Sequence, residues 1–260
     1  MTGIINSPQA LAQATVDGRV GEATISGDLF EECDCTDVVF EKCMFVNARF
    51  TSCVFTQARF TDCTFTTCEF ASCTFVDAAF ASCKFFDADT RKGCTFAFCE
   101  MDRCRLANCN LASTVFNRCE MHMMAASECS FRGTKLTRCD FARTFAKKRS
   151  SNKVKFTHCN FSFADLAELN LSEAILSDCQ FVETMLDGAD LTDADMHGST
   201  VSACDLRGAN LKGVNLEGGK LDGINLSELA GYKGLRISAS EQAPLLAALG
   251  ITVVWSDTRT

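Results

Sequence analysis

Large apolar residues recur at every fifth position through most of this chain. Ten successive phenylalanines keep this spacing from Phe40 to Phe85, and Phe, Leu or Met continue it to Leu226 after two interruptions. A period of five fits neither a helix, which repeats every 3.6 residues, nor a strand, which alternates every two. It fits a chain that turns a corner every five residues, so that four sides close one square coil.

The residue two places before each of these apolar positions is small, most often Cys or Ala. Seventeen of the 18 cysteines lie there, and the last, Cys35, occupies an apolar position itself. Each thiol is thereby placed in a Phe-lined interior, where burial makes it unreactive. We therefore interpret the cysteines as packing residues rather than metal ligands or redox groups.

The location of the protein follows from what the sequence lacks. No signal peptide is visible at the N-terminus, and no apolar segment is long enough to cross a membrane. We therefore expect a cytoplasmic protein with reduced thiols and no membrane contact.

The segment GANLKGVNLEGGKLDGINL carries the pattern A(D/N)LXX, and the chain resembles the pentapeptide-repeat family from about residue 18 to about residue 230. This resemblance implies an all-β fold, a right-handed quadrilateral parallel β-helix with two protruding loops and a short C-terminal helix. We expect a lead-in at residues 1–17, the β-helix at 18–230 and a capping or dimerisation segment at 231–260.

Two interruptions of the repeat predict loops. The spacing slips between Phe85 and Phe96, so a short loop is expected near 87–93. A longer gap between Phe141 and Phe156 predicts a basic, exposed loop at 144–153. This longer loop is either a solvated insertion or an arm that contacts a partner. The candidate partner-binding residues of the two loops are Asp87, Asp89, Arg91, Lys92, Phe145, Lys147, Lys148 and Arg149.

The C-terminal sequence QAPLLAALGI predicts a short helix that ends at Gly250, followed by a strand over 251–254. An open end of a β-helix needs a cap that protects its unpaired edge. The apolar stripe of the helix also offers a two-fold contact, which would give an end-to-end homodimer. The candidate dimerisation residues are Leu245, Leu246, Leu249, Ile251 and Val253.

The two loops and the tail together resemble those of the Qnr quinolone-resistance proteins, and the tail is similar to that of the albicidin-resistance pentapeptide proteins. The resemblance implies binding to DNA gyrase and topoisomerase IV, and protection of these enzymes from poisons that trap the cleaved DNA complex. The alternative is a scaffold or interaction module that has no topoisomerase role.

The formal net charge of −8 hides a strong segregation of charge. Residues 91–155 hold 14 basic and 5 acidic side chains, whereas residues 156–206 hold ten acidic and no basic ones, all at outward positions. We hypothesise that this acidic band presents a DNA-like field to a basic groove. The alternative is that it only keeps a hydrophobic rod soluble. Its candidate residues are Asp165, Glu168, Glu173, Asp178, Glu183, Asp187, Asp190, Asp193 and Asp195.

Other functions find little support. The basic middle segment could contact DNA directly, but no aromatic residues are interleaved with its charges. Its arginines include Arg103, Arg105, Arg118, Arg132 and Arg138. The three histidines, His122, His158 and His197, fall at outward positions without a metal-ligand spacing. Without catalytic or nucleotide-binding motifs, we expect no enzyme activity, no cofactor and no metal site.

Overall fold

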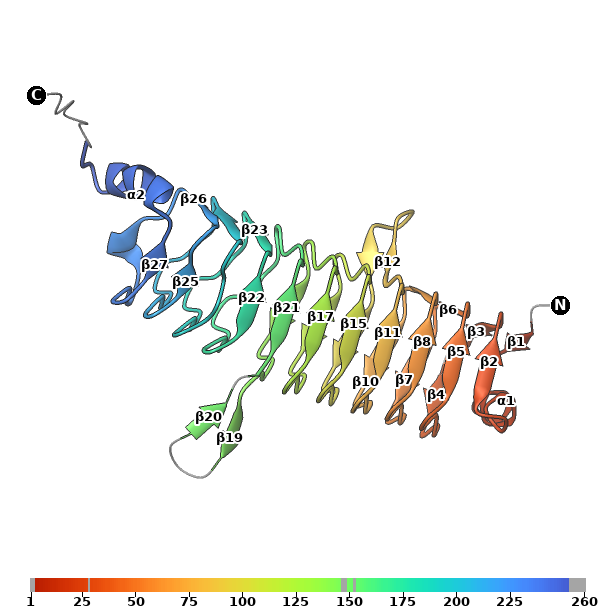
Figure 1. The fold of residues 1–260 in the computed structure, drawn as a ribbon. Helices are drawn as coiled ribbons and strands as arrows, with labels where there is room; N and C mark the ends of the chain where they lie inside the picture. The colour runs from red at the N-terminus through yellow and green to blue at the C-terminus, as the bar shows by residue number, and fades with distance from the viewer. Residues whose placement is uncertain (1–2, 28, 146–148, 152, 253–260) are drawn as a thin grey trace, which may run out of the picture.

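The chain winds into one long parallel β-solenoid of about eleven turns, with the two termini at opposite ends of the rod (Figure 1). The computed structural model describes residues 3–252 except 28, 146–148 and 152, and between 143 and 151 it describes only the backbone of two strands. The predicted β-helix is confirmed. Two hairpins protrude from it, and a short helix lies at its C-terminal end.

Each coil takes 20 residues and has four sides, which we number faces 1 to 4 in chain order. Face 1 contains Phe45, face 2 Phe50, face 3 Phe55 and face 4 Phe60. Phe45 pairs with Phe65 one coil further on, and the other faces repeat in the same way. The residue at the middle of each side, such as these phenylalanines, is called the centre below.

The strands are short and lie on three of the faces. Face 1 carries β1 (Ile4–Ile5), β3 (Thr24–Ser26), β6 (Met44–Val46), β9 (Thr64–Thr66), β23 (Gln180–Val182), β24 (Thr200–Ser202) and β26 (Lys220–Asp222). Face 2 carries β4 (Phe30–Glu31), β7 (Arg49–Thr51), β10 (Glu69–Ala71), β14 (Thr95–Ala97), β16 (Val115–Asn117) and β18 (Lys135–Thr137). Face 4 carries β2 (Arg19–Gly21), β5 (Val39–Glu41), β8 (Arg59–Thr61), β11 (Ala79–Ala81), β15 (Arg105–Ala107), β17 (Ala125–Ser127), β21 (Lys155–Thr157), β22 (Ile175–Ser177), β25 (Asn215–Leu216) and β27 (Arg236–Ile237). Face 3 is joined by isolated bridges such as Asp34 to Val54.

Aromatic rings fill the interior by stacking coil upon coil. On face 4 the ring centroid of Phe60 lies 4.9 Å from that of Phe40 and 4.6 Å from that of Phe80, and the planes are nearly parallel. These distances match the ~4.8 Å between neighbouring strands. Rings of adjacent faces meet edge to face, as Phe60 and Phe65 do at 5.7 Å. Each coil therefore buries its aromatic side chains against the coils above and below it.

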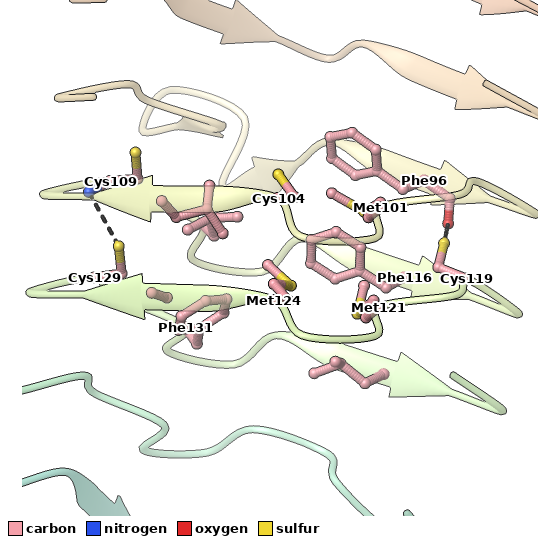
Figure 2. Packing of buried hydrophobic residues seen from close by; sticks show 14 of the residues in the cluster. Phe96, Met101, Cys104, Cys109, Phe116, Cys119, Met121, Met124, Cys129 and Phe131 are labelled. Carbon is pink, nitrogen blue, oxygen red and sulfur yellow. Dashed lines mark hydrogen bonds between the residues drawn. The ribbon is translucent and has the colours of Figure 1, made fainter. Parts of the chain in front are cut away.

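Thirteen of the 18 cysteines form two columns between the rings, part of which Figure 2 shows around Met101, Met121 and Phe116. Most of these thiols donate to a backbone carbonyl of the preceding coil, as the Sγ of Cys63 does to Phe40 at 3.4 Å. Thr184 makes the same bond through its hydroxyl, at 2.9 Å to Phe161. The column before face 1 is Cys43, Cys63, Cys83, Cys109, Cys129, Cys159 and Cys179, and the column before face 3 is Cys33, Cys53, Cys73, Cys99, Cys119 and Cys139. The position thus takes a small side chain that can donate a hydrogen bond.

Two buried cysteines outside these columns show how desolvation weakens a thiol as an acid. Burial raises the pKa of the Cys35 thiol to about 12 and that of Cys104 well above its ordinary value. Every cysteine is free, and only Cys204 is partly accessible. Because thiolates are the reactive form, the arrangement favours packing over redox chemistry.

Short helices cover both ends of the solenoid. At the N-terminal end α1 (Pro8–Ala14) begins at Ser7, whose hydroxyl accepts from the amide of Ala10 at 3.2 Å, and it buries Leu11. Strand β1 pairs with β3, so the residues predicted as a lead-in already belong to the first coil. At the other end β27 pairs with β25, so the ladder runs past the predicted boundary at 230. The helices η1 (Leu226–Glu228), η2 (Ala239–Glu241) and α2 (Gln242–Ala248) close this end.

None of the helices in the described part of the chain is long and apolar enough to span a membrane.

The stacked rings lead to a stability prediction. Phe60 is only 2% exposed, so Phe60→Ala should lower the free energy of unfolding by ~3–5 kcal/mol through lost burial and a residual cavity. Urea denaturation followed by circular dichroism measures the change. Phe98→Ala is the matched control, because Phe98 is 54% exposed, and a comparable loss in both variants would contradict the stacking argument.

Candidate partner-binding surfaces

The first predicted loop is a β-hairpin. Strand β12 (Phe86–Asp87) pairs antiparallel with β13 (Lys92–Gly93). The carboxylate of Asp87 closes the turn, since it accepts from the amide of Asp89 at 3.0 Å and from the hydroxyl of Thr90 at 2.6 Å. These hydrogen bonds lower the pKa of Asp87. Asp87 therefore shapes the hairpin, while Asp89, Arg91 and Lys92 are exposed at its surface.

The base of this hairpin is tightly packed against the next coil. A Cβ at Gly93 would collide with the peptide between Ser113 and Thr114. The amide of Cys94 donates to the carbonyl of Phe85 at 3.0 Å. By the pattern of the other coils, that carbonyl is the acceptor for Thr114. The hydroxyl of Thr114 is nevertheless buried without a hydrogen-bond partner among the described residues.

The second predicted loop is also a hairpin, formed by the antiparallel pair β19 (Arg143–Phe145) and β20 (Arg149–Ser151). Lys147 and Lys148 lie outside the described residues, and only the backbone of Phe145 and Arg149 is described. Their contacts with a partner stay a prediction.

The two hairpins leave the rod at diagonally opposite corners without disturbing its register. Phe70 pairs with Phe96, 26 residues on, so six residues are added to the 20 of one coil. Ala126 pairs with Phe156, 30 residues on, so the second insertion is ten residues. The first hairpin follows face 1 and the second follows face 3, and they project on opposite sides of the solenoid (Figure 1).

The acidic residues after the second hairpin encircle the rod. Glu168, Glu173, Asp178 and Glu183 each lie two residues after successive centres, so they occupy the four corners of one coil. All four have left-handed backbone angles, with φ between 52° and 60°, and all are exposed. Asp193 is exposed at the corner of the next coil that stacks on Glu173. The predicted acidic band therefore surrounds the rod on all four sides and is not confined to one face. We call these corner residues, with Asp193 on the next coil, the acidic ring.

The remaining acidic candidates serve the backbone as well. Asp165, Asp190 and Asp195 lie directly before a centre and accept hydrogen bonds from the amides two residues on, at 3.3, 3.0 and 3.3 Å. Asn160 and Asn170 form the same turn elsewhere, so this role needs no negative charge. The carboxylate of Asp187, which follows the centre Leu186, is half-buried.

Few basic groups offset the ring. Asp165 pairs with Lys135 at 3.1 Å, and Asp178 has the Nε2 atoms of His158 and His197 at 4.0 Å each. Ion pairs for Glu168, Glu173, Glu183, Asp187 and Asp193 are absent from the described part of the chain. Most of the negative charge at these corners is therefore left facing solvent.

All three histidines point away from the apolar core, as predicted, but one of them is buried at the surface. His158 and His197 are exposed, but His122 is only 8% exposed and Asp102 only 4%. Both side chains lie outside the apolar core. They are covered because Asp102 and His122 stack on each other between neighbouring coils, with His122 Nδ1 2.8 Å from Asp102 Oδ1.

Some apolar residues of the C-terminal segment pack against the solenoid, and others are exposed to solvent. Leu245 packs against the end of the core, and the carboxylate of Glu241 accepts from the amide of Leu221 at 2.8 Å, which satisfies a donor at the open edge. Leu246 is half-buried, whereas Leu249 and Ile251 are exposed by 42% and 49%.

The C-terminal helix ends at Gly250 as predicted, but the strand expected after it is not seen in the described residues. Gly250 ends it with φ +76°, and the amide of Ile251 bonds back to Leu246 at 2.9 Å. Residues 251–252 are not in a strand, in contrast to the expected strand, and Val253 lies outside the described residues.

The arginines proposed for direct DNA contact do not form one patch. Arg103 forms an ion pair with Asp77 at 2.7 Å. Arg118 lies over the ring of Phe98 and Arg132 over that of Phe163, with 5.6 and 4.2 Å to the ring centroids. Arg105 projects from face 4, and Arg118 and Arg138 share the corner between faces 2 and 3. A duplex lying along one side of the rod would meet only some of them.

Sequence reasoning missed a shallow trough on face 4. Its floor is made of small outward side chains on successive coils, and Arg105 and Lys155 contribute to its lining. It lies beside the corner from which the second hairpin emerges. The outward alanines Ala79, Ala81, Ala107 and Ala125 were the available signal, and they become a trough only when the coils are stacked.

Known proteins with this architecture share the repeat. The family model "Pentapeptide repeats" matches residues 33–71, and "Pentapeptide repeat region" matches residues 154–230, on both sides of the hairpins. This chain is a pentapeptide-repeat protein. A search of curated proteins found no match to it.

Two solved structures have the fold of this pentapeptide-repeat protein over nearly all of their length. A trypsin-treated variant of QnrB1, described as a plasmid-mediated fluoroquinolone resistance protein, matches with a TM-score of 0.72 and 20% identity, over 83% of this chain and all of that one. Full-length QnrB1 matches with a TM-score of 0.69 and 18% identity, over 90% of this chain and all of that one. The fold is therefore Qnr-like.

Gly93 allows a test of how the first hairpin is anchored. Gly93→Ala should lower the thermal midpoint, because the added methyl group cannot fit against the Ser113–Thr114 peptide. Gly21→Ala is the control, since nothing lies within 4 Å of a Cβ there and its φ is not left-handed. Equal midpoints for the two variants, measured by differential scanning fluorimetry, would argue against this anchoring.

Proposed function

We propose that this protein binds a type II DNA topoisomerase, DNA gyrase or topoisomerase IV, and protects it from topoisomerase-poisoning antibiotics. The observation that carries the proposal is the pair of hairpins on opposite corners of a rod whose fold matches a fluoroquinolone resistance protein along that protein's whole length. The protein acts by binding in the cytoplasm and not as an enzyme. A homodimer forms through the exposed Leu249 and Ile251.

The acidic ring supports partial mimicry of DNA. Ten carboxylates lie between residues 156 and 206, which span about two and a half coils or ~12 Å at ~4.8 Å per coil. Asp165 and Asp205 form ion pairs with Lys135 and Arg207. The other eight give one charge per ~1.5 Å, close to the one per ~1.7 Å of duplex DNA. Because the ring covers all four corners, a basic groove would meet negative charge from any side, as it does on a duplex.

The alternative function is a scaffold or interaction module without a topoisomerase role. A plain scaffold needs neither two inserted hairpins nor a ring of uncompensated carboxylates, and like charges on stacked corners such as Glu173 and Asp193 cost folding free energy. These features favour the topoisomerase partner.

The hairpins can be removed without breaking the repeat. Deletion of residues 143–152 leaves Phe141 and Phe156 five positions apart, and deletion of 87–92 does the same for Phe85 and Phe96. We expect the full chain to preserve gyrase supercoiling and reduce cleavage in the presence of a fluoroquinolone, and the 143–152 deletion to lose at least ~10-fold of this protection. Circular dichroism should show that both deletions keep the β-helix. No binding to either enzyme and no protection by the full chain would end the proposal.

A charge-reversal variant tests the mimicry separately. Replacing Glu173, Glu183 and Asp193 by lysine should weaken binding to gyrase and flatten its dependence on salt, because fewer charge contacts are screened. The matched control reverses Glu22, Asp37 and Asp62, which occupy the same left-handed corner positions in the N-terminal coils. Biolayer interferometry at several salt concentrations gives both quantities. If the two variants weaken binding equally, net charge rather than the ring is responsible.

A further inference from the structure

A cluster of titratable side chains lies at the base of the second hairpin. Asp102, His122 and Ala142 each follow a centre of face 3, on successive coils, and Arg143 begins β19 directly after Ala142. Glu120 and Asp140 precede two of the same centres and are paired across the coils. The cluster therefore spans three coils and adjoins the point where the hairpin leaves the rod.

The hydrogen bonds of His122 assign its tautomer. Nδ1 lies 2.8 Å from Asp102 Oδ1, and a carboxylate only accepts, so Nδ1 carries the proton. In the neutral ring this leaves the lone pair of Nε2 free. Nε2 faces Asp140 Oδ2 at 3.6 Å, which is too far for a hydrogen bond. Asp140 is held in this orientation because its other oxygen accepts from the amide of Ala142 at 2.9 Å.

The spacing fits a metal ion better than a hydrogen bond. Two ligands at ~2.0–2.2 Å from one ion, at tetrahedral to trigonal angles, lie ~3.3–3.8 Å apart, and Nε2 and Oδ2 are 3.6 Å apart. Glu120 lies beside His122, since Asp102, Glu120 and His122 each offer a ligand atom within 4.8 Å of the others. That group does not include Asp140, so the exposed side chain of Glu120 has to turn toward Asp140 to complete the set. A carboxylate bound to the far nitrogen of a histidine is the usual outer partner of a metal-ligating imidazole.

The negative charges around His122 also favour a bound cation. Glu100, Glu120 and Asp140 are stacked on successive coils of face 3. Neither Glu120 nor Asp140 has a Lys or Arg within ion-pair distance in the part of the chain that the structure describes. A cation between them would offset the repulsion of these like charges.

We propose that Glu120, His122 and Asp140 bind a divalent transition-metal ion such as Mn²⁺ or Zn²⁺, with Asp102 fixing the histidine ring from behind. One imidazole with two carboxylates suits these ions. The sequence analysis expected no metal site because His122 lacks a ligand spacing along the chain, and the ligands come together only across coils. A bound ion joins two coils at the base of the second hairpin, independently of any topoisomerase partner.

Mn²⁺ is the probe for the test, because it has little affinity for the 18 thiols. The full chain, stripped with a chelator and kept reduced, is titrated with Mn²⁺ by calorimetry and by the loss of the free-ion electron paramagnetic resonance signal. We expect one ion per chain and a higher thermal midpoint when it is bound. Asp102→Asn should weaken binding ~10–100-fold, as expected for a lost outer carboxylate.

Two further variants separate ligation from folding. Asp140→Asn keeps the backbone turn that Asn160 and Asn170 form elsewhere, yet removes a ligand charge, so it should fold and lose most Mn²⁺ affinity. Asp190→Asn is its control, because the same substitution in the same kind of turn lies away from the cluster and should bind as the original chain does. His122→Ala should abolish the site, and His158→Ala should not.

The proposal fails on either of two results. The first is no saturable binding of Mn²⁺ or Zn²⁺ by the full chain, which would leave His122 as a hydrogen-bonded link between two carboxylates. The second is binding that His122→Ala and Asp140→Asn leave unchanged. Co²⁺ provides a check on the ligands, since intense near-ultraviolet charge-transfer absorption would show cysteine ligation and also overturn the assignment.

Discussion

The distance between neighbouring coils decides what each side chain in this protein can do. Hydrogen bonds between strands fix that distance near ~4.8 Å, and stacked phenylalanines such as Phe45 and Phe65, at 4.5 Å, fill it. A residue therefore has two close neighbours that are determined by positions about 20 residues before and after it. Thiols reach a carbonyl of the preceding coil by the same rule, and carboxylates at the corners stack on one another. Core, surface charge and candidate metal cluster all derive from this one spacing.

The period of five was sufficient to predict a four-sided coil, because it has few physical solutions and the cysteines follow it. The parallel β-helix itself was implied by the resemblance to a known family. The positions of both insertions could also be read, since Phe96 and Phe156 resume the repeat out of step. Their antiparallel pairing could not, because the period carries no information about residues that leave the coil. The first coil was missed for a related reason: α1 replaces two of its sides, so only Ile5 and Val20 keep the pattern.

The candidate surfaces were less predictable than the fold, because they depend on neighbours across coils. Outward position alone suggested that His122 is exposed, yet Asp102 and Asp140 on adjacent coils enclose it. The acidic segment looked like a band until the corner positions of Glu168, Glu173, Asp178 and Glu183 showed it to be a ring. Aspartates before a centre looked equivalent to those at corners, but they also hold the backbone turn, as Asn170 does.

The regular coil also fixes the distance and the angle between the two hairpins. From Phe85 to Phe141 the chain advances 56 residues, of which six form the first hairpin, so the hairpins start two and a half coils apart, or ~12 Å. Adding one group of five residues between them would swing the second hairpin by a quarter turn, while adding four groups would move it ~4.8 Å further along at the same angle. The distance between the two hairpins along the rod and the angle between them can therefore change only in fixed steps. Only a few combinations of distance and angle can fit a partner of fixed shape.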